Sequence, residues 1–159
     1  DSILLKAGPL DRHERAIMKQ HTLLGAKLLR EGPQLFLRVV GNGRHEIPTK
    51  IDPTMEMAAE VALYHHERWD GRGYPEGLHQ DKIPLAARVV CLADAFEAMT
   101  SDRPYRAAMN PNVALEQLMP EQGAQFDPVV FDAFLNSFNR IKAIRLAVNE
   151  AESELSEVA

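Results

Sequence analysis

The chain has 159 residues, a formal net charge of -5, 45% hydrophobic and 26% charged residues. These values are typical of one soluble globular domain and argue against a disordered or fibrous protein. The acidic balance argues against non-specific binding to polymeric nucleic acid. The apolar runs are far shorter than the roughly 20 residues of a membrane helix, so we expect no membrane insertion. The single cysteine, Cys91, cannot form an internal disulfide, so we expect a reducing, cytoplasmic compartment.

The first predicted helix begins near Arg12. Asp11 and Glu14 have the spacing of a capping box, in which each side chain accepts a hydrogen bond from the backbone of the other residue. Apolar residues then recur at helical intervals and predict a buried stripe, formed by Ile17, Leu24 and Leu28. His21 falls on the same stripe. A histidine there is more often a satisfied core residue than a metal ligand.

Gly32-Pro33 predicts the end of this helix, and residues 34–50 are expected to be irregular, with a hairpin as the alternative. Asp52-Pro53 then predicts a helix start, because Asp caps the helix and proline suits its first position. This second helix should run to about Glu67, with an inward face formed by Met55, Ala58, Ala62, His65 and Trp69.

A third helix is predicted from Pro84, with Asp94 and Glu97 on one edge. Its other residues are apolar around most of the circumference, which predicts burial on most sides. Because a buried unpaired carboxylate costs several kcal/mol, Asp94 should be paired with a base, capped by donors or bound to a cation.

Two further helices are predicted, from Asn110-Pro111 to about Met119 and from Asp127-Pro128 onward. The apolar stripe of the last helix consists of Phe131, Phe134, Leu135, Phe138, Ile141 and Leu146. Residues 147–159 form its acidic end or tail. The sequence therefore predicts an all-α single domain over 1–159.

The adjacent histidines His65 and His66 indicate a metal site when His21 and Asp94 lie on other inward faces. Imidazole and carboxylate ligands suit Fe, Mn, Zn, Ni or Co, and the lack of nearby thiolates argues against a closed structural zinc site. Neighbours on a helix point about 100° apart, which favours two ions over one. In two-metal phosphoesterases such ions clamp phosphoryl oxygens and activate water. For the histidine pair alone, ordinary packing is the more frequent explanation.

The segment after the histidines has two features suited to an anionic ligand. Gly71 and Gly73 would allow close approach of the backbone, and the ring of Tyr74 could stack on a base or sugar. The alternative is a helix C-cap followed by a tight turn. Arg103 and Arg106 have the spacing for phosphate or guanine contacts, with a solvated charged turn as the alternative.

Residues 65–106 resemble the signature of the HD-GYP family, bacterial metal-dependent phosphodiesterases that degrade cyclic di-GMP. The resemblance extends to both sides and implies a helical bundle of the HD phosphohydrolase class. It implies two or three divalent ions, with iron or manganese favoured, held by His21, His65, His66 and Asp94. It implies a substrate-binding set formed by Gly71, Gly73, Tyr74, Pro75, Arg103 and Arg106. Glu97 and Asp70 are the acidic residues that we assign to catalysis on this basis.

The His-Asp pair of the family, with its following lysine and an earlier histidine, is not found in this sequence, and we expect the chain to be a C-terminal portion of a longer protein. For the intact parent protein the favoured function is hydrolysis of cyclic di-GMP to linear pGpG and/or GMP. For the chain as given, without the His-Asp pair, the following alternative is at least as favoured. The alternative is a catalytically inactive HD-GYP module that acts as a nucleotide sensor or protein-interaction domain. A third, weaker alternative is an HD-type phosphohydrolase for another nucleotide. An attached regulatory domain, a GGDEF-type protein and a second copy of the chain are the candidate partners.

Overall fold

The computed structural model describes residues 3, 6, 8–40, 52–102 and 106–157. Within these ranges there are five α-helices and two short 3-10 helices, without any strand. The α-helices are α1 (Arg12–Val40), α2 (Pro53–Tyr64), α3 (Leu85–Thr100), α4 (Pro111–Leu118) and α5 (Pro128–Glu157). The 3-10 helices are η1 (Gln80–Lys82) and η2 (Met119–Glu121). The all-α prediction is confirmed, and no helix in the described ranges is both long and apolar enough to cross a bilayer.

The helix starts follow local capping signals. At the start of α1, the amide of Asp11 donates to Glu14 at 2.8 Å and the amide of Glu14 donates to Asp11 at 2.9 Å, as a capping box requires. The Asp52 carboxylate and the Asn110 side chain each accept from the backbone two residues ahead, at 2.8 and 2.9 Å. The predicted starts of α2 and α4 are therefore confirmed together with their physical cause.

The predicted end of the first helix is wrong. α1 continues through Gly32-Pro33 to Val40, so residues 34–40 are helical and not irregular. A proline inside a helix costs about 3 kcal/mol, yet the 29-residue helix runs unbroken across this position. Residues 41–51 lie outside the described ranges, so a hairpin there stays a prediction. The second helix ends at Tyr64, three residues earlier than expected.

The predicted inward stripe of α1 is also wrong. Ile17, Leu24 and Leu28 are 40%, 62% and 70% exposed, whereas Thr22 and Ala26 are buried. In the described part of the chain α1 packs on α2, and one helical neighbour covers one face only. The spacing of the apolar residues therefore predicted a helix correctly but predicted the wrong side of that helix to be buried.

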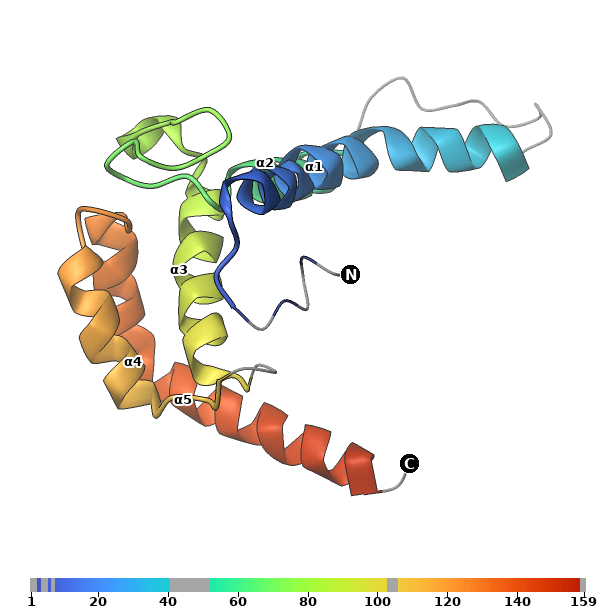
Figure 1. Ribbon diagram of the computed structural model, residues 1–159. Coiled ribbons are helices and arrows are strands. Elements are labelled where there is room, and N and C mark those ends of the chain that lie inside the picture. The colour runs from blue at the N-terminus through green and yellow to red at the C-terminus, as the bar shows by residue number, and fades with distance from the viewer. Residues whose placement is uncertain (1–2, 4–5, 7, 41–51, 103–105, 158–159) are drawn as a thin grey trace.

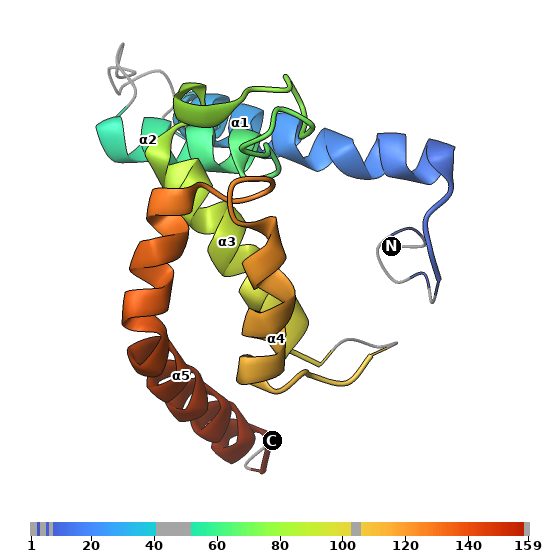
Figure 2. The same ribbon diagram turned by 90° about the vertical axis from the view of Figure 1, so that its left-hand side faces the viewer.

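α1 and α2 lie side by side and antiparallel across one end of the molecule (Figures 1 and 2). Three contacts along the two helices fix how α1 is aligned with α2. Arg30 forms an ion pair with Glu56 at 2.7 Å, a side chain on Gly25 would come within 3.5 Å of Ala62, and His21 lies beside His65. The first turns of α1 extend past the end of α2, beside the loop that follows it.

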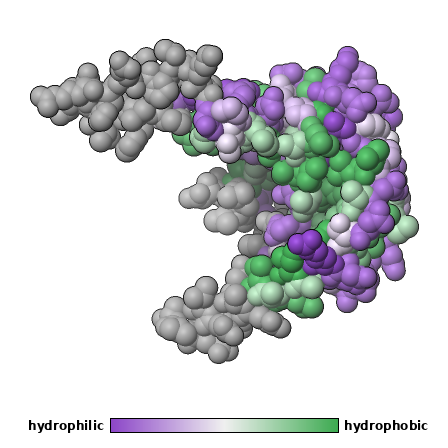
Figure 3. Space-filling model, turned by 180° about the vertical axis from the view of Figure 1, so that it is seen from behind, coloured by the Kyte–Doolittle hydropathy of each residue, from purple (hydrophilic) through white to green (hydrophobic). Residues whose placement is uncertain are grey.

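The main core lies between α3, α4 and α5 and is rich in phenylalanine, including Phe96, Phe126, Phe131 and Phe138. Most of the predicted stripe on the last helix belongs to this core, but Leu146 is exposed. The expected burial of α3 on most sides is wrong, because Leu85 and Val89 are exposed on an apolar groove of about 630 Å³ between α3 and α5. Hydrophobic side chains reach the surface on the face shown in Figure 3.

Candidate metal centre

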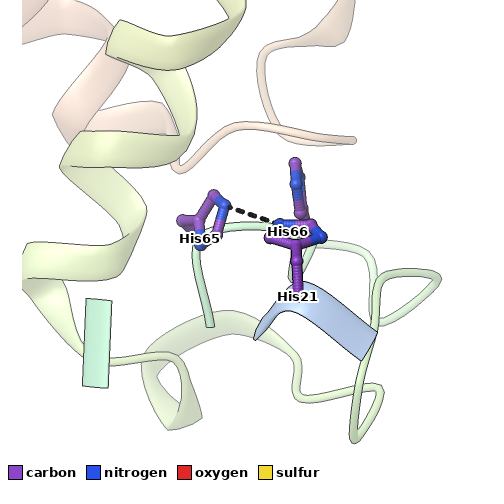
Figure 4. Close-up of side chains that lie close together, drawn as sticks. All are labelled: His21, His65 and His66. Atoms are coloured by element: carbon purple, nitrogen blue, oxygen red, sulfur yellow. Dashed lines mark hydrogen bonds between the residues drawn. The ribbon is translucent and has the colours of Figure 1, made fainter. Parts of the chain in front are cut away.

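Three imidazoles converge where α2 ends beside α1 (Figure 4). One nitrogen from each of His21, His65 and His66 lies within 4.8 Å of the other two. The Nε2 atoms of His21 and His65 are 3.5 Å apart, and the ring centroids of His65 and His66 are 4.1 Å apart. Within the described ranges this is the group of histidine, cysteine and acidic side chains with the geometry to hold an ion.

Backbone carbonyls set the tautomers of two of these rings. Nδ1 of His21 lies 2.6 Å from the carbonyl oxygen of Met18, and Nδ1 of His65 lies 3.0 and 3.1 Å from those of Val61 and Ala62. A carbonyl oxygen only accepts, so each Nδ1 carries the hydrogen and each neutral ring has its lone pair on Nε2. The two Nε2 atoms lie within hydrogen-bond distance of each other, at 3.5 Å (Figure 4), and in the neutral rings both lone pairs can be directed at one cation. The donor set therefore fits a divalent transition metal.

The third imidazole, His66, is kept neutral by its surroundings. Burial, with the charges of His65 and His21 as smaller causes, lowers the pKa of His66 to about 4. Neutral imidazole is the form that binds a metal ion. His66 can therefore act as a ligand at neutral pH without losing a proton.

The two acidic residues of α3 do not join the histidines directly. Asp94 is exposed and lies outside the group of ligand atoms within 4.8 Å, so the expected burial of its carboxylate is wrong. Its charge is nonetheless close enough to contribute to the raised pKa of Tyr74. Glu97 is exposed and accepts a hydrogen bond from Ser101 at 2.5 Å. Asp94 is thus near Tyr74, whose ring packs against His66.

Tyr74 connects the glycine-rich loop to the histidines. Its ring packs against His66 with centroids 4.9 Å apart, and its amide donates to the carbonyl of His66 at 3.2 Å. The ammonium group of Lys19 lies 4.6 Å from the centre of the ring. Burial, followed by the charge of Asp94, raises the pKa of Tyr74 to about 12, so the phenol keeps its proton at neutral pH.

Sequence reasoning missed Glu67, which holds this loop in place. Glu67 is 2% exposed, and its Oε1 accepts from the amides of Glu76 and Gly77 at 2.8 and 3.0 Å. Gly73 packs directly on the backbone of Glu67, where a Cβ atom would lie 2.4 Å from the Glu67 Cα. No local pattern marks such a residue, because its partners are backbone amides nine and ten positions along the chain.

Asp70 is engaged in an ion pair with Arg68 at 2.9 Å and accepts from the amide of Arg72 at 3.0 Å. The hydrogen bond from Arg68 is the main reason why the pKa of Asp70 lies below its usual range. Arg68 also pairs with Glu121 at 3.2 Å and donates to Gln125 at 2.8 Å, which ties the loop to the segment before α5. Asp70 therefore shapes the loop in this structure.

Of the two arginines expected to bind substrate, the structure describes Arg106 and not Arg103. Arg106 is exposed, and its guanidinium donates to the carbonyl of Ala98 at the end of α3. Arg103 lies outside the described residues, so its position stays a prediction.

A family model described as "HD domain" matches residues 1–130. The chain belongs to the HD domain family. This HD domain is 39% identical over 91% of its length to the cyclic di-GMP phosphodiesterase response regulator RpfG of Xanthomonas campestris pv. campestris, strain 8004. It is 38% identical over 85% of its length to a cyclic di-GMP phosphodiesterase of Thermotoga maritima. It is also 33% identical over 93% of its length to 3'3'-cGAMP-specific phosphodiesterase 2 of Vibrio cholerae.

These relatives confirm the resemblance that the sequence motifs indicated. The chain spans 33%, 32% and 25% of the length of these three proteins, respectively. The histidine centre and the loop around Tyr74 therefore belong to a domain that forms only part of each relative.

Proposed function

We propose that this HD domain is a metal-dependent phosphodiesterase that hydrolyses cyclic di-GMP to the linear dinucleotide pGpG, or on to GMP. The observation that carries the proposal is the convergence of His21, His65 and His66, with the Nε2 lone pairs of His21 and His65 directed into the group. The relatives named as cyclic dinucleotide phosphodiesterases support the choice of reaction.

In this proposal His21, His65 and His66 would hold two or three divalent ions, iron or manganese, with Asp94 of α3 as a further ligand. Such ions, when bound, polarise phosphoryl oxygens and lower the pKa of water. The chain supplies the rest of the site. The carbonyls of Met18, Val61 and Ala62 fix the orientation of two imidazoles, which keeps their lone pairs aimed at one region.

The substrate-binding side of the proposed site is the loop with Gly71, Gly73, Tyr74 and Pro75. Tyr74 presents a protonated phenol, which can donate to a phosphate oxygen, on a ring already held against His66. Arg103 and Arg106 would bind phosphate or guanine. Their cationic groups would also offset the charge that builds up on the phosphate oxygens as the diester is cleaved.

The two acidic residues assigned to catalysis have different roles in the proposal. Glu97, exposed on the same edge of α3 as Asp94, is the candidate for proton transfer near the substrate. Asp70 is committed to Arg68 and to the amide of Arg72, which supports a role in shaping the loop rather than in moving a proton.

A matched pair of histidines on α1 tests the proposal. His21→Ala removes a ligand, whereas His13→Ala removes an exposed histidine of the same helix that is not part of the group. We expect His21→Ala to lose bound metal, measured by inductively coupled plasma mass spectrometry, together with cleavage of cyclic di-GMP, measured by chromatography. His13→Ala should retain both within about twofold.

Normal metal content and turnover in His21→Ala would overturn the metal assignment. Assaying 3'3'-cGAMP in parallel decides the base preference, because relatives with both names match this chain. A protein that binds metal and cyclic di-GMP but cleaves neither compound would instead be the inactive sensor module.

A further inference from the structure

A basic face of α1 lies next to the candidate metal centre. Arg12, Arg15 and Lys19 are three and four residues apart, so they project from the same side of the helix. Together with Ala16 they line a hollow of about 400 Å³. All three are exposed, in a chain whose formal net charge is -5. The helix thus concentrates positive charge in one place against the overall balance.

The acidic residues nearest in sequence only partly offset this face: the hydrogen bond from the Glu14 amide is the main cause of the lowered pKa of Asp11, and the charge of Arg15 is a minor one. Asp11 and Glu14 are occupied by the capping box, and Glu14 also pairs with Lys6 at 2.5 Å. Among the described residues no carboxylate lies within ion-pair distance of Arg12, Arg15 or Lys19. Arg15 uses its Nε to donate to the carbonyl of Leu10 at 2.8 Å, which fixes the side chain and leaves its two terminal nitrogens for another acceptor.

Tyr74 makes the basic face continuous with the histidine centre. The Lys19 ammonium lies 4.6 Å from the Tyr74 ring centre, and that centre lies 4.9 Å from the His66 centroid. The Lys19 ammonium group and the His66 ring therefore both contact the same Tyr74 ring. A ligand bound at the histidines and extending over Tyr74 would meet Lys19 next, then Arg15 and Arg12 along the helix.

We propose that Arg12, Arg15 and Lys19 bind a phosphate group of the dinucleotide, namely the phosphodiester that is not being cleaved. This inference rests on the proposed function. A cyclic dinucleotide has two phosphodiesters, and when one lies at the metal centre the other needs its own positive partners. Guanidinium groups bind phosphate oxygens through paired N–H donors, and an ammonium group adds a compact charge. The basic face would bind one negatively charged phosphodiester while the metal centre binds the other.

The test uses a triple variant, Arg12→Gln, Arg15→Gln and Lys19→Gln, in the metal-loaded protein. The probe is a hydrolysis-resistant phosphorothioate analogue of cyclic di-GMP, and its affinity is measured by isothermal titration calorimetry. Guanosine, which has no phosphate, is the second probe. A control variant removes three positive charges elsewhere, at Lys27, Arg140 and Lys142, each changed to Gln. It keeps the net charge equal to that of the test variant.

We expect the triple variant to bind the analogue at least tenfold more weakly, with a shallower dependence on salt, because salt screens the attraction between exposed charges. Its affinity for guanosine and its Mn²⁺ content should be unchanged, and the control variant should resemble the wild type. Affinity for the analogue within twofold of the wild type would overturn the inference, as would an equal loss for guanosine or no binding by the wild type.

The same experiment separates this inference from the proposed function. If the wild type binds the analogue through the basic face but does not cleave cyclic di-GMP, the phosphate-binding role of the face stands and the proposed function fails. If the wild type cleaves cyclic di-GMP while the triple variant binds the analogue normally, the function stands and the inference fails.

Discussion

Replacing Gly73 with alanine should displace the loop that carries Tyr74. The new Cβ would lie 2.4 Å from the Glu67 Cα and from the Arg68 nitrogen, where ordinary contacts begin at 3.4 Å. Both atoms belong to the backbone, so no side-chain rotation relieves the overlap. The loop must move by about 1 Å, which strains the two hydrogen bonds that Glu67 accepts from Glu76 and Gly77.

Two contributions set the magnitude of this effect. Overpacking costs typically about 1–3 kcal/mol, and one lost hydrogen bond to a charged group costs about 1.5–3 kcal/mol. We therefore expect Gly73→Ala to lower the free energy of unfolding by about 2.5–6 kcal/mol. Urea denaturation measures the global effect, and amide hydrogen exchange at Glu76 and Gly77 measures the local one.

Gly25→Ala is the matched control for this prediction. Its Cβ would make an ordinary 3.5 Å contact with Ala62, and alanine is favoured over glycine in a helix by about 1 kcal/mol. Its stability should equal or exceed that of the wild type. The reasoning is refuted if Gly73→Ala matches the wild type both in urea midpoint and in the exchange rates of Glu76 and Gly77.

Two further predictions concern buried groups. Asp127, with a side chain 2% exposed, pairs with Arg88 at 2.6 Å, and removing one partner of a buried pair costs about 3–5 kcal/mol. Arg88 keeps Asp81 as a second partner at 3.1 Å, so we expect Asp127→Ala to lower the free energy of unfolding in urea by about 3 kcal/mol. The exposed control Asp132→Ala should lower it by less than about 1 kcal/mol. Equal decreases for the two variants would contradict this prediction. Burial raises the pKa of the Cys91 thiol to about 11. Because only the thiolate is alkylated, iodoacetamide at pH 8 should label Cys91 in the unfolded chain and leave it unlabelled in the folded chain. Complete labelling of folded protein in mass spectrometry would show the burial to be wrong.

The sequence alone determined where the helices begin, because capping is local. The Asp11–Glu14 box, Asp52-Pro53 and Asn110-Pro111 each satisfy backbone groups within three residues, so short stretches contain the whole signal. The same holds for the histidine pair and the glycine-rich loop, whose residue types alone predict a metal centre beside a ligand-binding loop.

Only the tertiary structure decided which faces are buried and which residues meet. His21 reaches His65 across 44 positions, and Glu67 binds amides nine and ten residues ahead. Periodicity could not tell that Ile17 and Leu24 face away from α2, or that Asp94 is exposed. Burial is a property of what packs against a helix, and that depends on contacts between distant segments that no local pattern contains.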